Sequence, residues 1–318
     1  MRDLVSVVIV TRGIKDYFLV CLESVFRQTY IPLEVTLIDN SMAPSVAAQV
    51  FAAYPSVRIV STGRNLYYCE ALNRGISKSR GTYVLCLNDD VRLEPSFLSE
   101  ALRGFDASSR IGMVTGKLLR PDRVTIDSAG MSLTLWRTPK ERGYGEQDRG
   151  QLDINGPVFA ANCAAALFRR SMLDDIREGE DWFDPDFRIF FEDLDICWRA
   201  RRRGWGVYYV PQAVAYHVRG GTVRQDSGEG RPLARQYLSD YMNALLLRNR
   251  YLVLIKNEKL WRLLFCSFPL LGYELLAWAY VLIYRPLVIK IFWSERSCFL
   301  RAWRKRLSWQ SGCRPGQG

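Results

Sequence analysis

Residues 4–10 read LVSVVIV, an apolar and β-branched run broken only by one serine. Such a run is typical of a strand buried on both faces of a parallel sheet. Similar runs follow at residues 33–39, 56–62 and 82–87, and helix-like stretches separate the four runs at 16–27, 43–53 and 68–79. This alternation predicts right-handed crossovers and an α/β fold with a parallel sheet.

Polar side chains follow two of these strands at the point where each one ends. Asp39 and Asn40 end the second strand, and the fourth runs into Asn88, Asp89 and Asp90. Ligands of open parallel sheets bind beyond the carboxyl ends of the strands. Adjacent carboxylates repel each other unless a cation compensates them, and Mg²⁺ is commonly held by one or two carboxylates plus phosphate oxygens. The Asn-Asp-Asp sequence therefore fits a metal–phosphate site, and equally a capping pair for the next helix or a solvated turn.

The second half of the chain alternates less regularly. We expect a helix near residues 95–105, a strand at 111–119, a mobile loop across the Gly-, Arg- and Asp-rich residues 137–156 and a strand at 158–168. A further helix begins near Glu192, ends at Gly204 and leads into another strand.

That helix carries a marked charge pattern, FFEDLDICWRARRRGW, at residues 190–205. Acids in its first turn and arginines in its last complement the helix dipole, and Asp195 and Arg199 have the spacing of a favourable ion pair. Helix stabilisation explains much of the pattern. Three acids, Glu192, Asp193 and Asp195, nevertheless exceed what capping needs. A helix N-terminus keeps Asp193 ionised, as a base must be before it accepts a proton.

His217 is the single histidine of the chain and lies in AYHVRGGT, residues 215–222. A lone histidine beside apolar residues is more often a buried structural residue than a ligand. Imidazole also suits divalent transition-type ions, and a neutral histidine would complete a site begun by carboxylates. The residues from Arg219 to Thr222 form a segment able to fold over a phosphate. The residues alone leave both interpretations of His217 open.

Charge and cysteine content narrow the class of protein. The chain has 318 residues and a net charge of +11, but residues 241–318 hold 13 Lys or Arg against three Asp or Glu, and the first 240 hold 31 against 30. The basic character belongs to the tail, which removes the main support for a nucleic-acid-binding protein. The eight cysteines are scattered without a C-x-x-C pair. We therefore expect reduced, buried thiols rather than a zinc cluster or disulfides.

Residues 263–293 are strongly apolar and aromatic, with basic residues on both sides. Their longest uncharged runs, 263–273 and 275–284, are shorter than the ~20 residues that span a bilayer. We favour a segment that lies in the membrane interface and contacts anionic lipid. A membrane span, or helices packed on the rest of the protein, are the alternatives.

Seven motifs, taken in order, resemble those of family-2 inverting glycosyltransferases with the GT-A fold, from the bacterial rhamnosyltransferase and galactofuranosyltransferase branch. They are VSVVIVTRG, LESVFRQTY, EVTLIDNS, GRNLYYCEALNRGI, GTYVLCLNDDV, FFEDLDICWRARRRG and HVRGGT, within residues 4–250. The resemblance implies a Rossmann-like GT-A domain with a mainly parallel central sheet at residues 1–235, divided into a nucleotide-sugar-binding half (1–92) and an acceptor and catalytic half (93–235). Residues 236–318 would form a C-terminal helical, apolar and basic membrane-associating region.

The resemblance also implies roles for single residues. Asp39 is similar to the acid that contacts the nucleotide base, and Thr11 lies on the loop that frames the same pocket. Asp90 and His217 resemble the ligands of a divalent metal, Mg²⁺ or Mn²⁺, and Asp193 resembles the general base. Further residues expected at the donor are Asn65, Asn73, Asn88 and Asp89, and those expected at the acceptor or diphosphate loop are Glu192, Arg219 and Thr222. An Arg248–Asn249 pair is similar to one found after the catalytic domain in this branch.

The implied activity is a single inverting, metal-dependent displacement. It would move a sugar such as rhamnose from a dTDP- or UDP-sugar to a hydroxyl of a glycan or polyprenyl-diphosphate-linked acceptor in cell-surface polysaccharide assembly. The N-terminus shows no signal-peptide pattern. We expect a peripheral or monotopic protein at the cytoplasmic face of the bacterial inner membrane, and a homo-oligomer is compatible with the sequence.

The sequence departs from the family pattern at two places. Asn88 stands where the family has the first acid of its D-x-D-type motif, and Tyr67, Tyr68 and Cys69 replace small residues, so we expect a reshaped donor pocket.

A sugar nucleotidyltransferase would normally carry a Gly-rich basic loop after the first strand, and VTRGIKDYF has a single glycine. A non-catalytic membrane-binding protein of GT-A fold would need neither the Glu-Asp pair nor the metal-ready acids.

Overall fold

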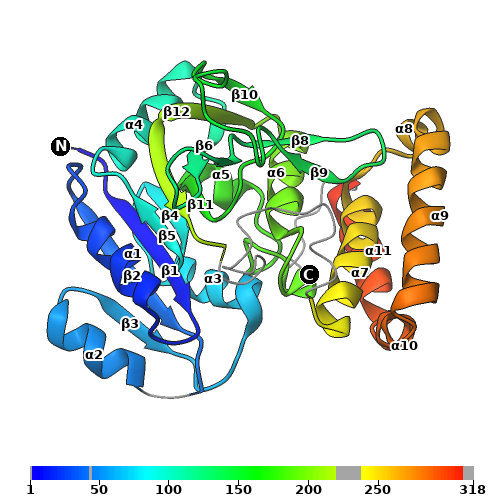
Figure 1. Cartoon of the computed structure of the whole chain (residues 1–318), viewed down its shortest axis with the longest axis horizontal. Helices are drawn as coiled ribbons and strands as arrows, with labels where there is room; N and C mark the ends of the chain where they lie inside the picture. Colours follow the sequence, from blue (N-terminus) through cyan, green and yellow to red (C-terminus); the bar gives the residue numbers. More distant parts are fainter. Residues whose placement is uncertain (1, 43–44, 220–237, 311–318) are drawn as a thin grey trace.

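The computed structural model describes residues 2–42, 45–219 and 238–310 and shows a mixed α/β fold (Figure 1). The strands are β1 (Val5–Thr11), β2 (Leu33–Asp39), β3 (Arg58–Ser61), β4 (Tyr83–Asn88), β5 (Val91–Leu93), β6 (Ile111–Leu119), β7 (Ile126–Ser128), β8 (Met131–Leu133), β9 (Pro139–Glu141), β10 (Gly156–Val158), β11 (Ala165–Arg169) and β12 (Gly206–His217). The helices are α1 (Asp16–Phe26), α2 (Ser45–Ala53), α3 (Tyr67–Ser77), α4 (Phe97–Arg103), α5 (Arg170–Asp175), α6 (Glu192–Arg202), α7 (Asp240–Asn257), α8 (Leu260–Phe265), α9 (Ser267–Tyr284), α10 (Leu287–Ser294) and α11 (Ser297–Gln310), with short 3₁₀ turns η1 (Gly104–Ala107) and η2 (Pro185–Phe187).

The central sheet has the strand order β10-β12-β6-β11-β4-β1-β2-β3, with β5 beside β12 and β7 beside β6. Strand β1 runs parallel to β2 and β4, β3 is parallel to β2, and β12 is parallel to β6. Strand β11 is inserted antiparallel between β4 and β6. The predicted mainly parallel sheet is therefore confirmed.

Successive residues of β1 face two different hydrophobic cores. Val7 and Ile9 pack with residues of α1, α2 and α4 on one face of the sheet, whereas Val8 and Val10 pack with residues of α3, α5 and α6 on the other. Because both faces are covered by helices, the strand reads as a continuous apolar run. This is why the first four strands can be recognised in the sequence.

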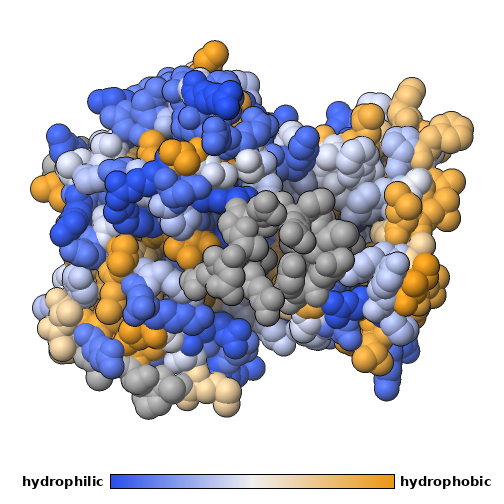
Figure 2. Space-filling view, viewed as in Figure 1, coloured by the Kyte–Doolittle hydropathy of each residue, from blue (hydrophilic) through white to orange (hydrophobic). Residues whose placement is uncertain are grey.

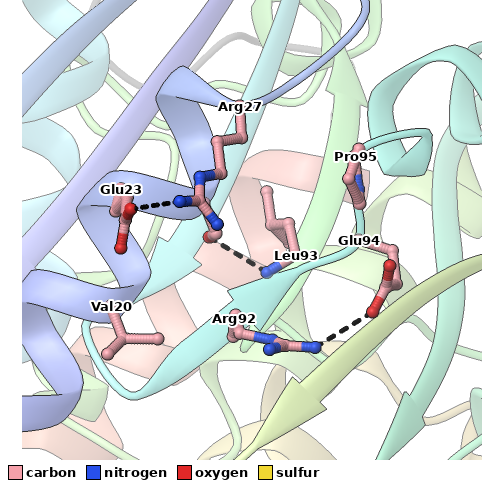
Figure 3. Close-up of a pocket in the computed structure, with 8 residues that line it drawn as sticks. Val20, Glu23, Arg27, Arg92, Leu93, Glu94 and Pro95 are labelled. Carbon is pink, nitrogen blue, oxygen red and sulfur yellow. Dashed lines mark hydrogen bonds and ion pairs between the residues drawn. The ribbon is translucent and has the colours of Figure 1, made fainter.

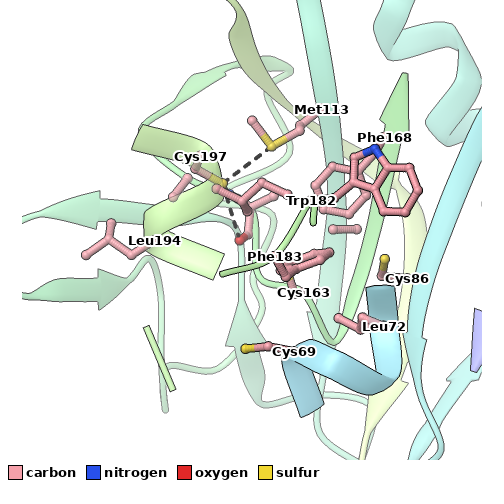
Figure 4. Packing of buried hydrophobic residues seen from close by; sticks show 14 of the residues in the cluster. Cys69, Leu72, Cys86, Met113, Cys163, Phe168, Trp182, Phe183, Leu194 and Cys197 are labelled. Atoms are coloured by element: carbon pink, nitrogen blue, oxygen red, sulfur yellow. Dashed lines mark hydrogen bonds between the residues drawn. The ribbon is translucent and has the colours of Figure 1, made fainter. Parts of the chain in front are cut away.

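The cysteines serve as small core residues. Cys69, Cys86, Cys163 and Cys197 lie in the core that also holds Phe168 (Figure 4). All seven cysteines of the described part of the chain are free and buried. Burial raises the pKa of Cys197 to about 12, which makes its thiol unreactive. The expectation of reduced, buried thiols is confirmed for these seven residues.

Two predictions for the second half were wrong. The strand expected at 158–168 is divided, because Asn162 Oδ1 accepts a hydrogen bond from the Ala164 amide (2.8 Å) and turns the chain between β10 and β11. The loop expected at 137–156 contains β9, and buried Lys117 ties it to β6 through ion pairs with Asp148 (2.8 Å) and Asp153. Long-range contacts of this kind leave no local signal in the sequence.

The C-terminal helices are continuous with the body of the protein. Leu252 and Val253 of α7, and Cys298 and Ala302 of α11, belong to the same core as Trp198 of α6. Helices α8 and α9 lie outermost, at the end of the molecule opposite α2 and β3 (Figure 1). Helices α7 and α11 thus connect the outer helices to the α/β core.

Candidate functional site

The carboxyl ends of three adjacent strands bring polar side chains to one edge of the sheet. Thr11 pairs with Asp39 in the β1–β2 register, and Val10 pairs with Asn88 in the β1–β4 register. The Thr11 hydroxyl donates to Asp89 Oδ2 (2.7 Å). Burial raises the pKa of Asp89 to about 6, with a further contribution from Asp90, although the Thr11 hydrogen bond opposes the shift. The structure therefore brings these predicted residues together.

Asn40 extends this edge towards the predicted donor residue Asn65. The Asn40 amide donates to Asn65 Oδ1 (3.1 Å), and its carbonyl accepts from the Leu66 backbone amide (2.7 Å). Asp39 is buried, and its Oδ1 accepts a hydrogen bond from the Ser41 amide (3.1 Å). Asn40 thus fixes the Asn65 loop against the end of β2. The sequence did not indicate this role of Asn40.

Asn73 has a different environment from the other predicted donor residues. Its amide donates to Asp181 Oδ1 (2.8 Å) and to the Phe183 carbonyl (2.7 Å), and its carbonyl accepts from the amides of Trp182 and Phe183. These bonds use both ends of the side chain to hold residues 181–183. We therefore leave Asn73 out of the proposed donor site.

The two departures from the family pattern contact each other. The Tyr68 hydroxyl donates to Asn88 Oδ1 (2.6 Å) and lies 3.3 Å from the Cys163 carbonyl. An ionised acid at position 88 would also accept this bond, but it would add a third carboxylate beside Asp89 and Asp90. Asn88 accepts the tyrosine without that added charge. The two departures from the family pattern, the large Tyr68 and the neutral Asn88, are therefore linked by one hydrogen bond.

His217 links carboxylates from two other elements. The β12–β5 register places His217 opposite Val91, next to Asp90, and its Nε2 lies 3.3 Å from Asp90 Oδ1. Its Nδ1 lies 2.9 Å from Oδ2 of Asp127, a fully buried residue of β7. Burial opposes a charged imidazole, but the hydrogen bonds to Asp127 and Asp90 outweigh it and raise the pKa of His217 to about 9. The two carboxylates beside the imidazole therefore stabilise a positive charge at this position.

These residues fit a divalent cation bound together with a phosphorylated ligand. A carboxylate that orients a metal-binding histidine through its other ring nitrogen is the usual support for such a ligand, and Asp127 occupies that position. No group of three or more His, Cys, Asp or Glu side chains arranged for a metal occurs in residues 2–42, 45–219 and 238–310. Asp90 and His217 would therefore act as two protein ligands, with diphosphate oxygens and water as the others, as is common for Mg²⁺.

Arg219 and Glu141 complete the charge pattern around Asp127. Arg219 Nε donates to Asp127 Oδ1 (2.5 Å), and its guanidinium lies 4.9 Å from the ring centroid of Tyr144. Its Nη2 is buried without a hydrogen-bond partner among the described residues, so one guanidinium donor is left unused by them. Burial raises the pKa of Glu141 to about 7, and the charges of Asp127 and Asp193 add to the shift while Arg219 opposes it.

Glu192 and Asp193 begin α6, and Asp193 interacts electrostatically with Glu141 and Arg219 of this cluster. Burial raises the pKa of Asp193 to about 6, while the hydrogen bond that its Oδ1 accepts from the Leu194 amide (2.7 Å) and the charge of Arg219 oppose the shift. Burial, together with the charge of Asp193, raises the pKa of Glu192 to about 8. Glu192 Oε2 is buried without a hydrogen-bond partner in the part of the chain that the structure describes. The raised pKa makes the ionised Asp193 a stronger base than an ordinary carboxylate.

Asp127 and Glu141 are the functional residues that the sequence did not reveal. Both lie in three-residue strands, β7 and β9, that have no recognisable periodicity. Asp127 follows Ile126 in TIDSAG, and a single acid beside an apolar residue is too common to identify a site. Of the predicted residues, Thr222 lies outside the described part of the chain.

A pocket of about 220 Å³ lies between α1 and β5, lined in part by Val20, Leu93 and Pro95 (Figure 3). Its charged side chains pair with each other, Arg27 with Glu23 and Arg92 with Glu94. None of its lining residues belongs to the acidic cluster. We assign it no part in the chemistry.

Comparison with known proteins gives one family match and several relatives. Residues 2–230 match the model described as glycosyltransferase like family 2. An N-acetylglucosaminyl-diphospho-decaprenol L-rhamnosyltransferase of Mycobacterium tuberculosis is 25% identical over 272 residues, which cover 76% of this chain and 84% of that protein. A poly-β-1,6-N-acetyl-D-glucosamine synthase of Staphylococcus aureus is 23% identical over 197 residues, 61% of this chain and 45% of that protein.

Two solved structures share the fold. A mannosyltransferase from Pyrobaculum calidifontis in complex with GDP-Man and Mn²⁺ superposes with a TM-score of 0.56 at 16% identity, over 98% of this chain and 80% of that one. GalNAc-T7 with UDP, GalNAc and Mn²⁺ superposes with a TM-score of 0.60 at 16% identity, over 80% of this chain and 48% of that one, so the chain spans about half the length of GalNAc-T7. Both are GT-A glycosyltransferases, and the expected fold class is confirmed.

Proposed function

The chain belongs to glycosyltransferase family 2, and from the geometry of its site we propose that it is an inverting, metal-dependent transferase that moves a sugar such as rhamnose from a dTDP- or UDP-sugar to a polyprenyl-diphosphate-linked glycan. The observation that carries this proposal is the meeting of three groups. The strand ends hold Asp39, Asp89 and Asp90, β12 and β7 add His217 and Asp127, and Asp193 at the start of α6 interacts electrostatically with Arg219 and Glu141 beside them. The rhamnosyltransferase relative, whose name specifies a decaprenol-linked acceptor, supports the choice of sugar and acceptor.

Each side chain then has a task in a single displacement. Asp39 and Asn65 bind the nucleoside, and Arg219 Nη2 binds a diphosphate oxygen. Asp193 accepts the proton of the acceptor hydroxyl while that oxygen bonds to the anomeric carbon and the bond to the diphosphate oxygen breaks. One base and one leaving group on opposite faces of the sugar invert its configuration. A cation held by Asp90 and His217 would neutralise the charge of the departing diphosphate.

The donor is the first point to test. A screen of dTDP- and UDP-sugars against thermal unfolding, with Mn²⁺ or with EDTA, reads binding through stabilisation of the folded state. We expect at least one of these donors to raise the melting temperature in Mn²⁺ and to lose most of that effect in EDTA. Stabilisation by none of them at millimolar concentration would contradict the proposal.

The outer face of α9 supports an interfacial membrane contact. Its exposed side chains are mostly apolar, and Figure 2 shows apolar residues gathered at the edge of the molecule where α9 and α10 lie. The large exposed apolar side chains of α9 are Phe268, Leu271, Leu275, Leu276, Leu282 and Ile283, and the exposed Ser267 and Tyr284 lie at its two ends. Helix α9 is the one helix in the described ranges long and apolar enough to cross a membrane, with a mean hydropathy of 1.3 over 18 residues.

The inner face of α9 favours the interface over a span. Glu274 pairs with Arg250 and Tyr251 of α7, and the Trp278 indole donates to the Tyr251 hydroxyl (2.8 Å). A spanning α9 would break these contacts and carry Glu274 into lipid, where a charged side chain costs a few kcal/mol or more. Exposed cations of the C-terminal helices and their connections that suit anionic lipid headgroups are Lys259, Arg262, Lys290, Arg296 and Arg304.

A double substitution tests this surface. Leu275→Gln with Leu276→Gln keeps good helix formers at both positions but removes two exposed apolar side chains, each of which contributes ~1.5–3 kcal/mol when it leaves water completely. We expect at least tenfold weaker binding to vesicles containing phosphatidylglycerol in a sedimentation assay. The control is Ile154→Gln, an 80% exposed residue between β9 and β10, which should leave binding unchanged. Equal binding of the double variant and the parent would place the membrane contact elsewhere.

A further inference from the structure

The segment that leads into the proposed base has a strained backbone. Residues 184–191, which we term the base loop, contain η2 and end one residue before Glu192. Arg188, Phe190 and Phe191 have positive φ angles of 62°, 71° and 66°, a region that side chains other than glycine rarely occupy. Such strain persists only where surrounding contacts fix the backbone.

The contacts that fix the base loop come from α7. Asn249 Nδ2 lies 2.7 Å from the carbonyl oxygen of Phe187, 2.8 Å from that of Ile189 and 2.9 Å from that of Phe190. Arg248 Nη2 donates to the Asp186 carbonyl (2.5 Å). Both side chains are almost completely buried, and Arg248 Nε and Nη2 also donate to Asn249 Oδ1. The pair therefore binds the carbonyls of Asp186, Phe187, Ile189 and Phe190 in the strained segment as one unit.

Side chains of the same loop are paired with the C-terminal helices. Asp184 lies 2.6 Å from the amino groups of both Lys256 on α7 and Lys305 on α11. Arg188 makes a bidentate ion pair with Glu295, at 2.9 and 3.0 Å. The loop thus carries charges that the C-terminal region neutralises.

The opposite side of the base loop reaches the donor side of the site. The Arg188 carbonyl accepts hydrogen bonds from the backbone amides of Tyr68 (2.9 Å) and Cys69 (3.0 Å), at the start of α3. The Tyr68 hydroxyl in turn contacts Asn88. A shift of the loop would therefore change the position of Asp193 relative to the donor.

We propose that Arg248 and Asn249 are positioning residues for catalysis: they hold the strained base loop so that Asp193 is placed against the acceptor hydroxyl and the donor. The C-terminal region is then part of the catalytic machinery as well as a membrane contact. This inference rests on the proposed function of Asp193. It also implies that deletion of residues 257–318 would impair transfer as well as any membrane binding, because the deletion removes Glu295 and Lys305 from their ion pairs with the loop.

The test compares two asparagines of α7. Asn249→Ala removes the contacts with the loop, whereas Asn243→Ala removes a similarly buried asparagine whose amide contacts the Leu238 and Ser239 carbonyls. A displacement of about 1 Å costs roughly 10²-fold in rate. We expect kcat of Asn249→Ala to fall at least tenfold with the donor KM within twofold of the parent, and Asn243→Ala to keep both. A kcat of Asn249→Ala within threefold of that of Asn243→Ala, or a fall explained by a donor KM that rises in proportion, would overturn the proposal.

Two further variants are needed. Glu295→Gln tests the proposal if Asn249→Ala does not fold, and Asp193→Asn distinguishes failure of this proposal from failure of the proposed function. If Asn249→Ala yields no folded protein, Glu295→Gln decides, because it weakens the ion pair with Arg188 at a half-buried position. We expect kcat to fall at least fivefold with an unchanged donor KM, and an unchanged kcat would overturn the proposal. Inactive Asp193→Asn beside fully active Asn249→Ala would reject the positioning role alone. Active Asp193→Asn would reject the base itself, and the positioning role with it.

Discussion

Replacing Asp193 with Asn is expected to reduce sugar transfer by about 10²–10⁴-fold, the usual contribution of a general base. Asn keeps the shape of the side chain and the carbonyl oxygen that accepts the Leu194 amide. It cannot take the proton of the acceptor hydroxyl. The measurement is kcat with a lipid-linked acceptor, together with the affinity for dTDP or UDP. That affinity should stay within twofold of the parent, because the proposed role of Asp193 is to act on the acceptor rather than on the nucleotide.

Stability and pH separate this effect from misfolding. Burial raises the pKa of Asp193 to about 6, well above the ~3.9 of an unfolded Asp. The folded chain therefore binds the proton more tightly, and the associated stability is lost as the pH rises through about 6. Asn cannot ionise, so Asp193→Asn avoids this loss of stability and should melt at or above the melting temperature of the parent at pH 7.5. In the parent, kcat should fall tenfold per unit below pH 6. Normal turnover in a folded Asp193→Asn protein would exclude this residue as the base.

Removing the metal is expected to reduce transfer by ~10²–10³-fold, since a bound cation contributes several kcal/mol to stabilising a charged leaving group. EDTA should lower the transfer rate by this factor, and Mn²⁺ or Mg²⁺ should restore it. Asp127→Asn should weaken Mn²⁺ binding 10–100-fold in calorimetry with dTDP or UDP present, because Asp127 orients His217 without binding the metal itself.

The chain offers a matched control for this experiment. Asp122 lies in the connection between β6 and β7, shortly before Asp127, but it is exposed and bonds to Thr125. Asp122→Asn should leave Mn²⁺ affinity unchanged. Full activity of the parent in EDTA would remove the metal from the account, and equal Mn²⁺ affinity in Asp127→Asn and Asp122→Asn would remove Asp127 from the site.

The sequence could predict those parts of the site that local pattern and strand order determine. Thr11, Asp39 and Asn88 end continuous apolar strands, and the register of a parallel sheet brings such ends together. Asp195 and Arg199 have helical spacing and form the expected ion pair at 2.8 Å. These features depend on residues that are close in the sequence or on a regular repeat.

The rest depends on contacts between distant segments. Asp127 reaches His217 because β7 pairs with β6, next to β12, and no periodicity marks that strand. The basic tail was expected to face lipid, yet its Lys256 is 2% exposed and pairs with Glu178, Asp184 and Asp195. Net charge shows where cations lie in the sequence, but it cannot show which acids they meet after folding.

The most direct test of the central claim is the anomeric configuration of the product. A purified parent enzyme, the nucleotide sugar identified by thermal stabilisation and a polyprenyl-diphosphate-linked glycan acceptor would be followed by NMR during transfer. We predict that the new glycosidic bond has the configuration opposite to that of the sugar in the donor, because one base and one leaving group act from opposite faces. A product with retained configuration, or the absence of transfer from the donor that binds, would contradict the account.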